Sequence, residues 1–322
     1  MHLIKKQIED NQISIDYHNL TEFDLHIYAI NLSIYICYYL RISNKDLREE
    51  FVKKINEIFI FKDFLKLPEL EEKFIVDNIV VNKGIAKNKA LLENIFSLFS
   101  AINTKIPIFI VGKPGCSKSL SVQLINKSMK GTSSNNDLFK KLPNLMTFSF
   151  QGSLSNTSED VVSMFNKASN ALERLNEKER KKNIVLLYFD EMGLAEYSSN
   201  NLFKVIHSRI EYDEIEENKK VAFVGISNWG LDASKMNRGI HISLSEPDEK
   251  DIILTALSIA DYYDKGFGIT YNSFFSNLGK VYYEYKQYLK EKHSSDGKED
   301  IHGNIDFYHF IKYFLKNIIL TK

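Results

Sequence analysis

Between residues 106 and 244 the sequence alternates short apolar runs with helix-like stretches, and this alternation restricts the possible fold more than any other feature. The runs are IPIFIV (106–111), LMTFSF (145–150), IVLLYF (184–189), VAFVGI (221–226) and GIHISL (239–244). Continuous apolar runs suit strands that are buried on both faces of a parallel sheet. The helical stretches between them suit crossover connections. The sequence therefore predicts an α/β fold built on a parallel sheet.

Helical patterns flank this region on both sides. Apolar positions such as Leu32 and Ile36 recur at helical spacing before residue 75. LPEL (67–70) places a proline near a helix start, and residues 83–103 have the pattern of one long helix. After Pro247 the pattern is helical again. We expect a helical segment before the sheet and a second helical unit after it.

The composition narrows the possible partners and the compartment. The 42 Lys and Arg residues equal the 42 Asp and Glu residues, so no global field favours nucleic acid or an anionic membrane. The apolar runs are far shorter than the ~20 residues that span a bilayer, so no transmembrane segment is expected. The N-terminus lacks the apolar core of a secretory signal. Two cysteines without metal-site spacing agree with a reducing compartment, and a cytoplasmic location is expected.

The octapeptide GKPGCSKS (112–119) directly follows the first apolar run and nearly matches the phosphate-binding loop G-x-x-x-x-G-K-[ST]. Backbone N–H groups of such a loop face the phosphates, and the following helix adds about half a positive charge at its N-terminus. Lys118 is expected to reach the phosphates and the Ser119 hydroxyl to bind Mg²⁺. The other reading is an ordinary strand, turn and helix. The candidate nucleotide-binding residues are Gly112, Lys113, Pro114, Gly115, Cys116, Ser117, Lys118, Ser119 and Leu120.

Ser117 stands where the motif has its last glycine. That position often requires a positive φ, which costs a non-glycine residue roughly 1–2 kcal/mol. Binding with micromolar affinity corresponds to a favourable free energy of ~8 kcal/mol. Serine also keeps its N–H donor, so the substitution is expected to weaken the site without abolishing it.

Polar residues follow the third and fourth predicted strands. Asp190 and Glu191 come directly after IVLLYF, at the edge of the sheet where ligands of open α/β folds bind. Asp190 is expected to hold Mg²⁺ through water, and Glu191 to polarise an attacking water. Asn228 at the next strand tip is expected to orient that water. Arg238 precedes the last strand as a candidate arginine finger. The alternative for the two acids and for the asparagine is that they are ordinary turn residues. The alternative for the arginine is an ordinary surface position.

Several segments together resemble an AAA+ module, and more narrowly one of the mysterin family of giant RING-finger ubiquitin ligases. They are IPIFIVGKPGCSKS, FDEMGLAE, VGISNWGLDASKMNRGI and LSEPDEKDII, and the likeness covers roughly residues 68–315. Modules of that family also carry serine in place of the glycine, so Ser117 fits a family trait. The resemblance implies a five-stranded sheet of order 5-1-4-3-2, ATP with Mg²⁺ as ligands, and a C-terminal helical lid.

The resemblance also implies a domain division, site roles and partners. The nucleotide-binding core is expected over 67–246 and the lid over 247–322, with 1–66 as the end of a preceding module's lid. Asp190 and Glu191 correspond to the metal-holding and catalytic acids, Asn228 to sensor 1 and Arg238 to the finger. Neighbouring AAA+ modules, in the same chain or as a ring, are the implied partners, with ubiquitin-pathway proteins reached through the parent protein.

The sequence departs from the family pattern at three places. Ile305 stands where a sensor-2 arginine is expected, which puts hydrolysis or its coupling to the lid in doubt. The loop QGSLSNTSED (151–160) lacks the aromatic residue with which unfoldases grip a polypeptide, so a threading translocase is not expected. No Cys/His cluster is present for a zinc ligase centre, so ubiquitin transfer is not encoded in this chain.

Two functional hypotheses of different classes follow. The first is an ATP-binding and ATP-hydrolysing AAA+ module that couples nucleotide state to the conformation of a larger ring or array. The second is a structural module that binds ATP with negligible turnover, which Ile305 favours. A P-loop kinase or a small GTPase is disfavoured by the Asp190–Glu191 pair, by Asn228 and by the absence of an Asn-Lys-x-Asp motif.

Overall fold

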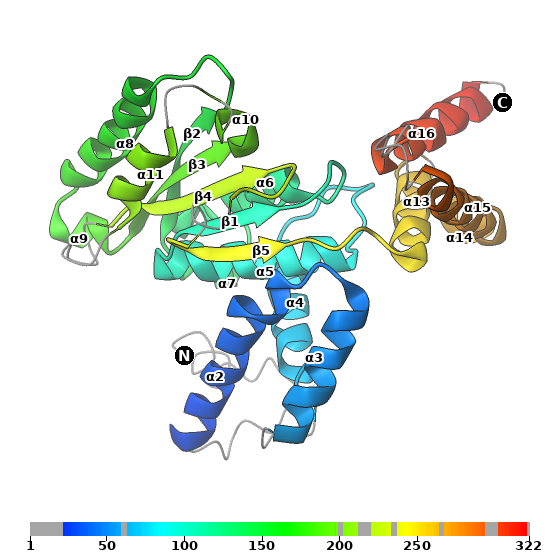
Figure 1. Ribbon diagram of the computed structural model, residues 1–322, viewed down its shortest axis with the longest axis horizontal. Coiled ribbons are helices and arrows are strands. Elements are labelled where there is room, and N and C mark those ends of the chain that lie inside the picture. Colours follow the sequence, from blue (N-terminus) through cyan, green and yellow to red (C-terminus); the bar gives the residue numbers. More distant parts are fainter. Residues whose placement is uncertain are drawn as a thin grey trace.

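The structure is a computed structural model that describes residues 22–58, 63–196, 198, 202–211, 220–232, 237–263, 267–293 and 302–320. The first 21 residues of the predicted N-terminal helical segment therefore lie outside the described part. A central sheet carries helices on both faces, the N-terminal helices lie below it in Figure 1, and the C-terminal helices lie beyond the carboxyl end of its strands.

The sheet contains five parallel strands in the order β2-β3-β4-β1-β5, which confirms the predicted order. Every predicted apolar run forms a strand, with ends shifted by one or two residues. The strands are β1 (Ile108–Val111), β2 (Asn144–Gln151), β3 (Asn183–Asp190), β4 (Ala222–Ser227) and β5 (Ile240–Ser243). The inner strands β1, β3 and β4 are buried along nearly their whole length, because helices cover both faces of the sheet.

Helices before and between the strands supply the two covering layers. Alternate side chains of each strand point to opposite faces, so β1 gives Ile108 and Ile110 to one core and Phe109 and Val111 to the other. The helices and short 3₁₀ turns are α2 (Glu22–Cys37), η2 (Tyr39–Arg41), α3 (Lys45–Ile58), α4 (Lys66–Asn78), α5 (Lys89–Thr104), α6 (Lys118–Ser128), η3 (Gly131–Ser133), α7 (Asp137–Lys140), α8 (Ser158–Glu173), α9 (Glu177–Arg180), α10 (Met192–Glu196) and α11 (Leu202–Ile210).

The long helix expected over 83–103 begins later than predicted, as α5 at Lys89. Gly84 adopts a φ of 84°, which a helix does not contain. Asn88 then caps the helix, because its side chain accepts a hydrogen bond of 3.0 Å from the Leu91 backbone N–H. Residues 79–88 therefore form the connection between α4 and α5.

The N-terminal helices share one core with the sheet. Tyr35, Leu40 and Phe64 belong to the same buried cluster as Ile108 and Ile110 of β1. The division of the chain at residue 66 remains a prediction, and the helices on either side of it pack against α5.

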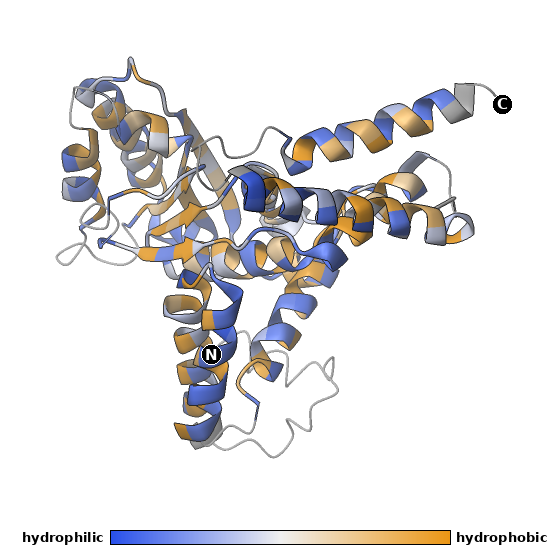
Figure 2. Cartoon of the chain, turned by 45° about the vertical axis from the view of Figure 1, so that its right-hand side comes forward, coloured by the Kyte–Doolittle hydropathy of each residue, from blue (hydrophilic) through white to orange (hydrophobic). Residues whose placement is uncertain are grey.

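The helices after the sheet form a separate packing unit, as expected for a lid. They are α13 (Glu249–Tyr263), α14 (Phe267–Thr270), α15 (Asn272–His293) and α16 (Asn304–Leu320). Ile252, Phe275, Phe307 and Ile311 are among the buried residues of their own core. Figure 2 shows hydrophobic and hydrophilic residues alternating along α16, which agrees with a helix that packs on one side only. The proposed lid boundary at residue 247 remains a prediction.

Candidate functional site at the carboxyl edge of the sheet

The loop between β1 and α6 contains the candidate phosphate-binding residues and is called the phosphate loop below. Gly115 has a φ of 88° and Ser117 a φ of 58°, so both adopt the left-handed region. The non-glycine residue at 117 therefore occupies the strained conformation that the sequence predicted. The first helical residue of α6 is Lys118, which places the N-terminus of this 11-residue helix at the loop.

A buried side chain from α5 supports the loop from below. Asn94 is fully buried, and its amide nitrogen donates a 2.9 Å hydrogen bond to the carbonyl oxygen of Cys116. Burial raises the pKa of the Cys116 thiol, so this cysteine fills space beneath the loop as a neutral group. Asn94 was not predicted as a site residue, because a polar position within a helix gives no indication of a loop above it.

Lys118 is buried and its ammonium group lies within the loop. It donates hydrogen bonds to the carbonyl oxygens of Gly112, at 2.5 Å, and Lys113, at 2.9 Å. Burial lowers the pKa of this ammonium, and the carboxylates of Glu191 and Asp190 act in the opposite direction. The ammonium group of Lys118 is thus held against the loop by two of its carbonyl oxygens.

Ser119 and Asp190 lie side by side across the gap between α6 and β3. The Ser119 hydroxyl is 3.4 Å from both carboxylate oxygens of Asp190. A hydroxyl and a carboxylate are oxygen ligands of the kind that Mg²⁺ prefers, so this pair fits the predicted metal. Among the described residues, no group of three or more His, Cys, Asp or Glu side chains is arranged to hold a metal ion.

Glu191 follows β3 in a left-handed turn, with a φ of 49°. The start of the loop after β2 passes so close that a side-chain carbon at Gly152 would lie 2.2 Å from the Glu191 carbonyl oxygen. The Asn228 amide nitrogen lies 2.9 and 2.7 Å from the two carboxylate oxygens of Glu191. The structure therefore brings the two predicted residues together, with the amide holding the carboxylate.

Arg238 lies at the other end of the strands. It precedes β5, whose first backbone N–H, that of Ile240, donates to the Pro107 carbonyl before β1. The guanidinium group forms an ion pair with Glu211, which follows α11. Arg238 is therefore separated from the other predicted residues by the length of the sheet and cannot reach the phosphate loop of its own chain.

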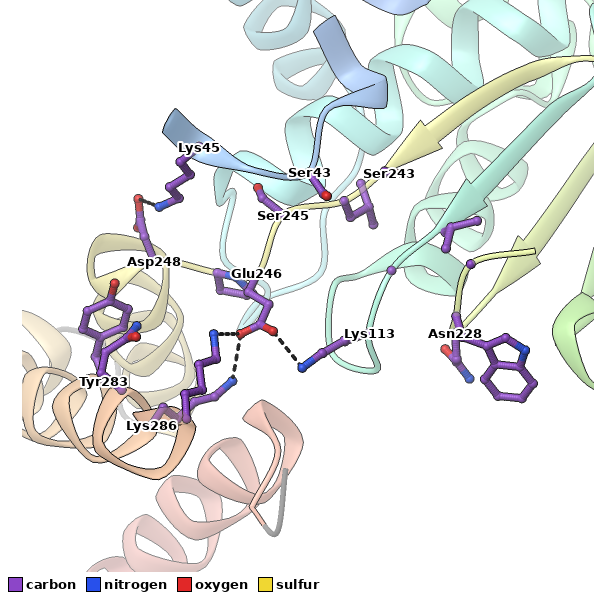
Figure 3. A pocket seen from close by; sticks show the side chains of 18 residues that line it. Ser43, Lys45, Lys113, Asn228, Ser243, Ser245, Glu246, Asp248, Tyr283 and Lys286 are labelled. Atoms are coloured by element: carbon purple, nitrogen blue, oxygen red, sulfur yellow. Dashed lines mark hydrogen bonds and ion pairs between the residues drawn. The ribbon is translucent and has the colours of Figure 1, made fainter. Parts of the chain in front are cut away.

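A cleft of about 660 Å³ opens beside the phosphate loop, between the ends of β1, β4 and β5 and the lid helix α15. Figure 3 shows Glu246 at its centre, with lysines on either side. Glu246 follows β5 and accepts ion pairs from Lys113 in the loop and from Lys290 in the lid. The sequence analysis missed Glu246, although its place just after a strand was a usable signal, and it missed Lys290, for which no signal existed.

Comparison with known proteins identifies the family of this chain. Residues 84–251 match the family model described as the RNF213 AAA domain. Human E3 ubiquitin-protein ligase RNF213 is 36% identical over 247 residues, and Danio rerio E3 ubiquitin-protein ligase rnf213-beta is 37% identical over 257 residues. These matches cover 75% and 76% of the chain but only 5% of each relative, so the chain spans about a twentieth of their length.

Two solved structures also align with the fold. "Structure of C. elegans PCH-2" has a TM-score of 0.33 and 14% identity, and covers 88% of this chain and 71% of that chain. "Structure of Rhizobiales Trip13" has a TM-score of 0.33 and 13% identity, and covers 92% and 91%. Within the described residues, no helix has both the length and the apolarity needed to cross a membrane. The family match and the identity to the two ligases confirm the resemblance to the mysterin family: this chain belongs to the family of RNF213 AAA domains.

Proposed function

We propose that this chain is an AAA+ module that binds ATP with Mg²⁺ and hydrolyses it. One observation carries the proposal: the loop lysine, the Ser119–Asp190 pair and the Glu191–Asn228 pair all meet at one edge of the sheet. The loop amides and Lys118 bind the phosphates. Ser119 and Asp190 hold Mg²⁺, which neutralises negative charge on the phosphate oxygens.

In this proposal Glu191 acts as the general base. Its carboxylate takes a proton from a water molecule, and the water oxygen forms a bond to the terminal phosphorus as the bond from that phosphorus to the bridging oxygen breaks. The products are ADP and inorganic phosphate. Asn228 keeps the carboxylate in place by donating to both of its oxygens. The turnover of a variant without this amide is therefore expected to fall more than its affinity for ATP.

Arg238 completes the site of a neighbouring AAA+ module in this proposal. Its place at the opposite edge of the sheet prevents action within its own chain. Modules in a ring or in tandem, in the cytoplasm, are the partners that this placement suits. Because the relatives are ubiquitin ligases of which the chain covers a small part, we propose that nucleotide-driven changes in this module act on a larger ligase, whose ubiquitin chemistry lies elsewhere.

Two substitutions test the proposal. Lys118→Ala is expected to abolish ATP binding measured by isothermal titration calorimetry, and Lys127→Ala, on the exposed part of the same helix, is the matched control. Glu191→Gln is expected to retain ATP binding and to stop phosphate release, with Glu196→Gln as its control. Retained binding in Lys118→Ala would show that the phosphate contacts are misplaced.

The role of Arg238 is tested by mixing two inactive variants. Arg238→Ala retains its own Glu191, and Glu191→Gln retains its own Arg238, so a mixed assembly contains complete sites. Phosphate release is expected to rise on mixing. A mixture no more active than its separate components would contradict action between modules.

A second candidate function is a structural module that binds ATP with negligible turnover. Ile305 favours it: its Cγ1 atom lies 3.4 Å from the position that a side-chain carbon on Gly115 would occupy. An apolar group thus contacts the phosphate loop where a sensor-2 arginine was expected. If the unmutated protein in its assembled state binds ATP but releases no phosphate, this second function is correct.

A further inference from the structure

The cleft beside the phosphate loop contains an excess of positive charge. Three ammonium groups surround the single carboxylate of Glu246: Lys290 at 2.6 Å, Lys113 at 2.8 Å and Lys286 at 3.7 Å. We call Lys113, Lys286 and Lys290 the lysine cluster. With Glu246 ionised, these four side chains carry two more positive charges than negative ones. Figure 3 shows how the carboxylate bridges the loop lysine and the lid lysines.

Lys286 differs from the other members of the cluster in its burial. Its side chain is 8% exposed, whereas those of Lys113 and Lys290 are 38% and 44% exposed. A lysine is rarely buried to this extent without close partners. Its Glu246 contact is the longest of the three, and its shortest described contact is a neutral one, a 3.0 Å hydrogen bond to the side-chain oxygen of Asn304. The ammonium is therefore positioned by groups that neutralise it only in part.

Asn304 brings this ammonium to the phosphate loop. Its Cβ atom lies 3.4 Å from the place of a side-chain carbon on Gly115, and the neighbouring Ile305 lies at the same distance. The residue that was expected to supply a lid cation is thus apolar, whereas its neighbour Asn304 binds the ammonium group of a lysine from the preceding lid helix. Lys286 is also one of the charges that act on the Cys116 thiol within the loop.

The cleft connects Lys286 with the reaction site. Its walls include Gly112 and Lys113 at the start of the loop, and Asn228, which holds Glu191. The phosphate group that lies between the start of the loop and Glu191 is the terminal one, because that carboxylate is the proposed base for its cleavage. A cation in this cleft therefore meets the terminal phosphate before the inner ones.

We propose that Lys286 binds the terminal phosphate of a nucleoside triphosphate. When it does so, its contacts with Glu246 and Asn304 break. Phosphate oxygens carry more charge than one carboxylate shared by three ammonium groups, so the exchange favours the ligand. The position of the lid helix α15 then depends on whether the terminal phosphate is present. This inference rests on the proposed function, since it requires that the loop binds nucleotide.

The test compares affinities for an unhydrolysed ATP analogue and for ADP, both with Mg²⁺, by isothermal titration calorimetry. Lys286→Met keeps an unbranched side chain that is one atom shorter and removes the charge. One charge-assisted hydrogen bond corresponds to about a tenfold or larger loss of affinity for the ATP analogue. Affinity for ADP is expected to change less than about threefold. Lys286→Arg is expected to restore most of the preference for the ATP analogue.

Two comparison variants distinguish a direct contact between Lys286 and the terminal phosphate from a general effect of positive charge on nucleotide affinity. Lys280→Met removes the same charge from an exposed position of α15 and is expected to change neither affinity. Lys290→Met removes a charge that shares Glu246 and is expected to have a smaller effect than Lys286→Met. Equal effects of the Lys286 and Lys290 variants would show a diffuse field and would overturn the inference.

A variant that is expected to gain affinity keeps the inference testable if Lys286→Met does not fold. Glu246→Gln removes the carboxylate that competes for Lys286, so affinity for the ATP analogue is expected to rise severalfold and more than affinity for ADP. An unchanged preference for the ATP analogue contradicts the inference. If the unmutated protein binds neither nucleotide, the proposed function fails; if it binds both and Lys286→Met weakens them equally, only the inference about Lys286 fails.

Discussion

Removing the charge of Arg48 will test how the N-terminal helices are joined to the core. Arg48 of α3 lies 2.8 Å from Glu93 of α5, and their side chains are 5% and 2% exposed. The guanidinium also donates to the Ile42 carbonyl and lies over the ring of Tyr39, 4.8 Å from its centre. The pair is therefore buried, and the Nη2 atom of the arginine is buried without a hydrogen-bond partner among the described residues.

The expected loss of unfolding free energy in Arg48→Met follows from the contacts that remain to Glu93. Glu93 would keep only the ammonium of Lys89, at 3.9 Å, as a described ion-pair partner, and that lysine is half exposed. Leaving one member of a buried ion pair without its partner costs about 3–5 kcal/mol. The exposed pair of Lys54 and Glu50 is the control, and Lys54→Met is expected to leave the free energy of unfolding nearly unchanged because solvent screens this pair.

Urea unfolding followed by circular dichroism measures these differences. The double variant Arg48→Met/Glu93→Gln is expected to be more stable than Arg48→Met alone, because it no longer buries an unpaired charge. A loss below about 1 kcal/mol for Arg48→Met, or a double variant that loses the sum of the two single losses, would refute the reasoning that these charges depend on one another.

Three further predictions concern single side chains. Burial raises the pKa of Glu72, beside Tyr35, to about 8, so the folded state keeps a proton that the unfolded state loses. The free energy of unfolding should therefore fall as pH rises from about 4.5 to 8, and Glu72→Gln should flatten that fall in urea titrations. Asn228→Ala should lower phosphate release at least tenfold with ATP affinity within about threefold, since it frees Glu191; equal losses in both would contradict this role. Ser117→Val should lower the free energy of unfolding by about 1–3 kcal/mol relative to Ser117→Gly, because a β-branched residue is strained at positive φ; equal stabilities would argue against the left-handed conformation.

The parts of the site that the sequence predicted depend on local patterns. The loop residues are contiguous, and Lys118 and Ser119 follow from one motif. Asp190 ends β3 and Asn228 directly follows β4, and parallel strands place their carboxyl ends at one edge of the sheet. Once the strands were recognised, these side chains had to converge, as the structure shows for Ser119 with Asp190.

The parts that the sequence could not predict depend on contacts between distant segments. Lys286 is one of several lysines along α15, and helical spacing does not distinguish the one that faces the loop. Glu93 and Glu72 occupy positions that periodicity assigns to a buried face, where a carboxylate is unexpected without knowledge of its partner. Arg48 and Glu93 are 45 residues apart, and only the packing of α3 on α5 brings them together.

Two adjacent residues of α5 contact different parts of the chain. Glu93 holds Arg48 of the N-terminal helices, and Asn94 holds the carbonyl of Cys116 in the phosphate loop. The two residues are consecutive in one helix, so a movement of α5 would shift both contacts together. A displacement of Arg48 could therefore be passed to Cys116 through α5 alone, without involving the strands of the sheet.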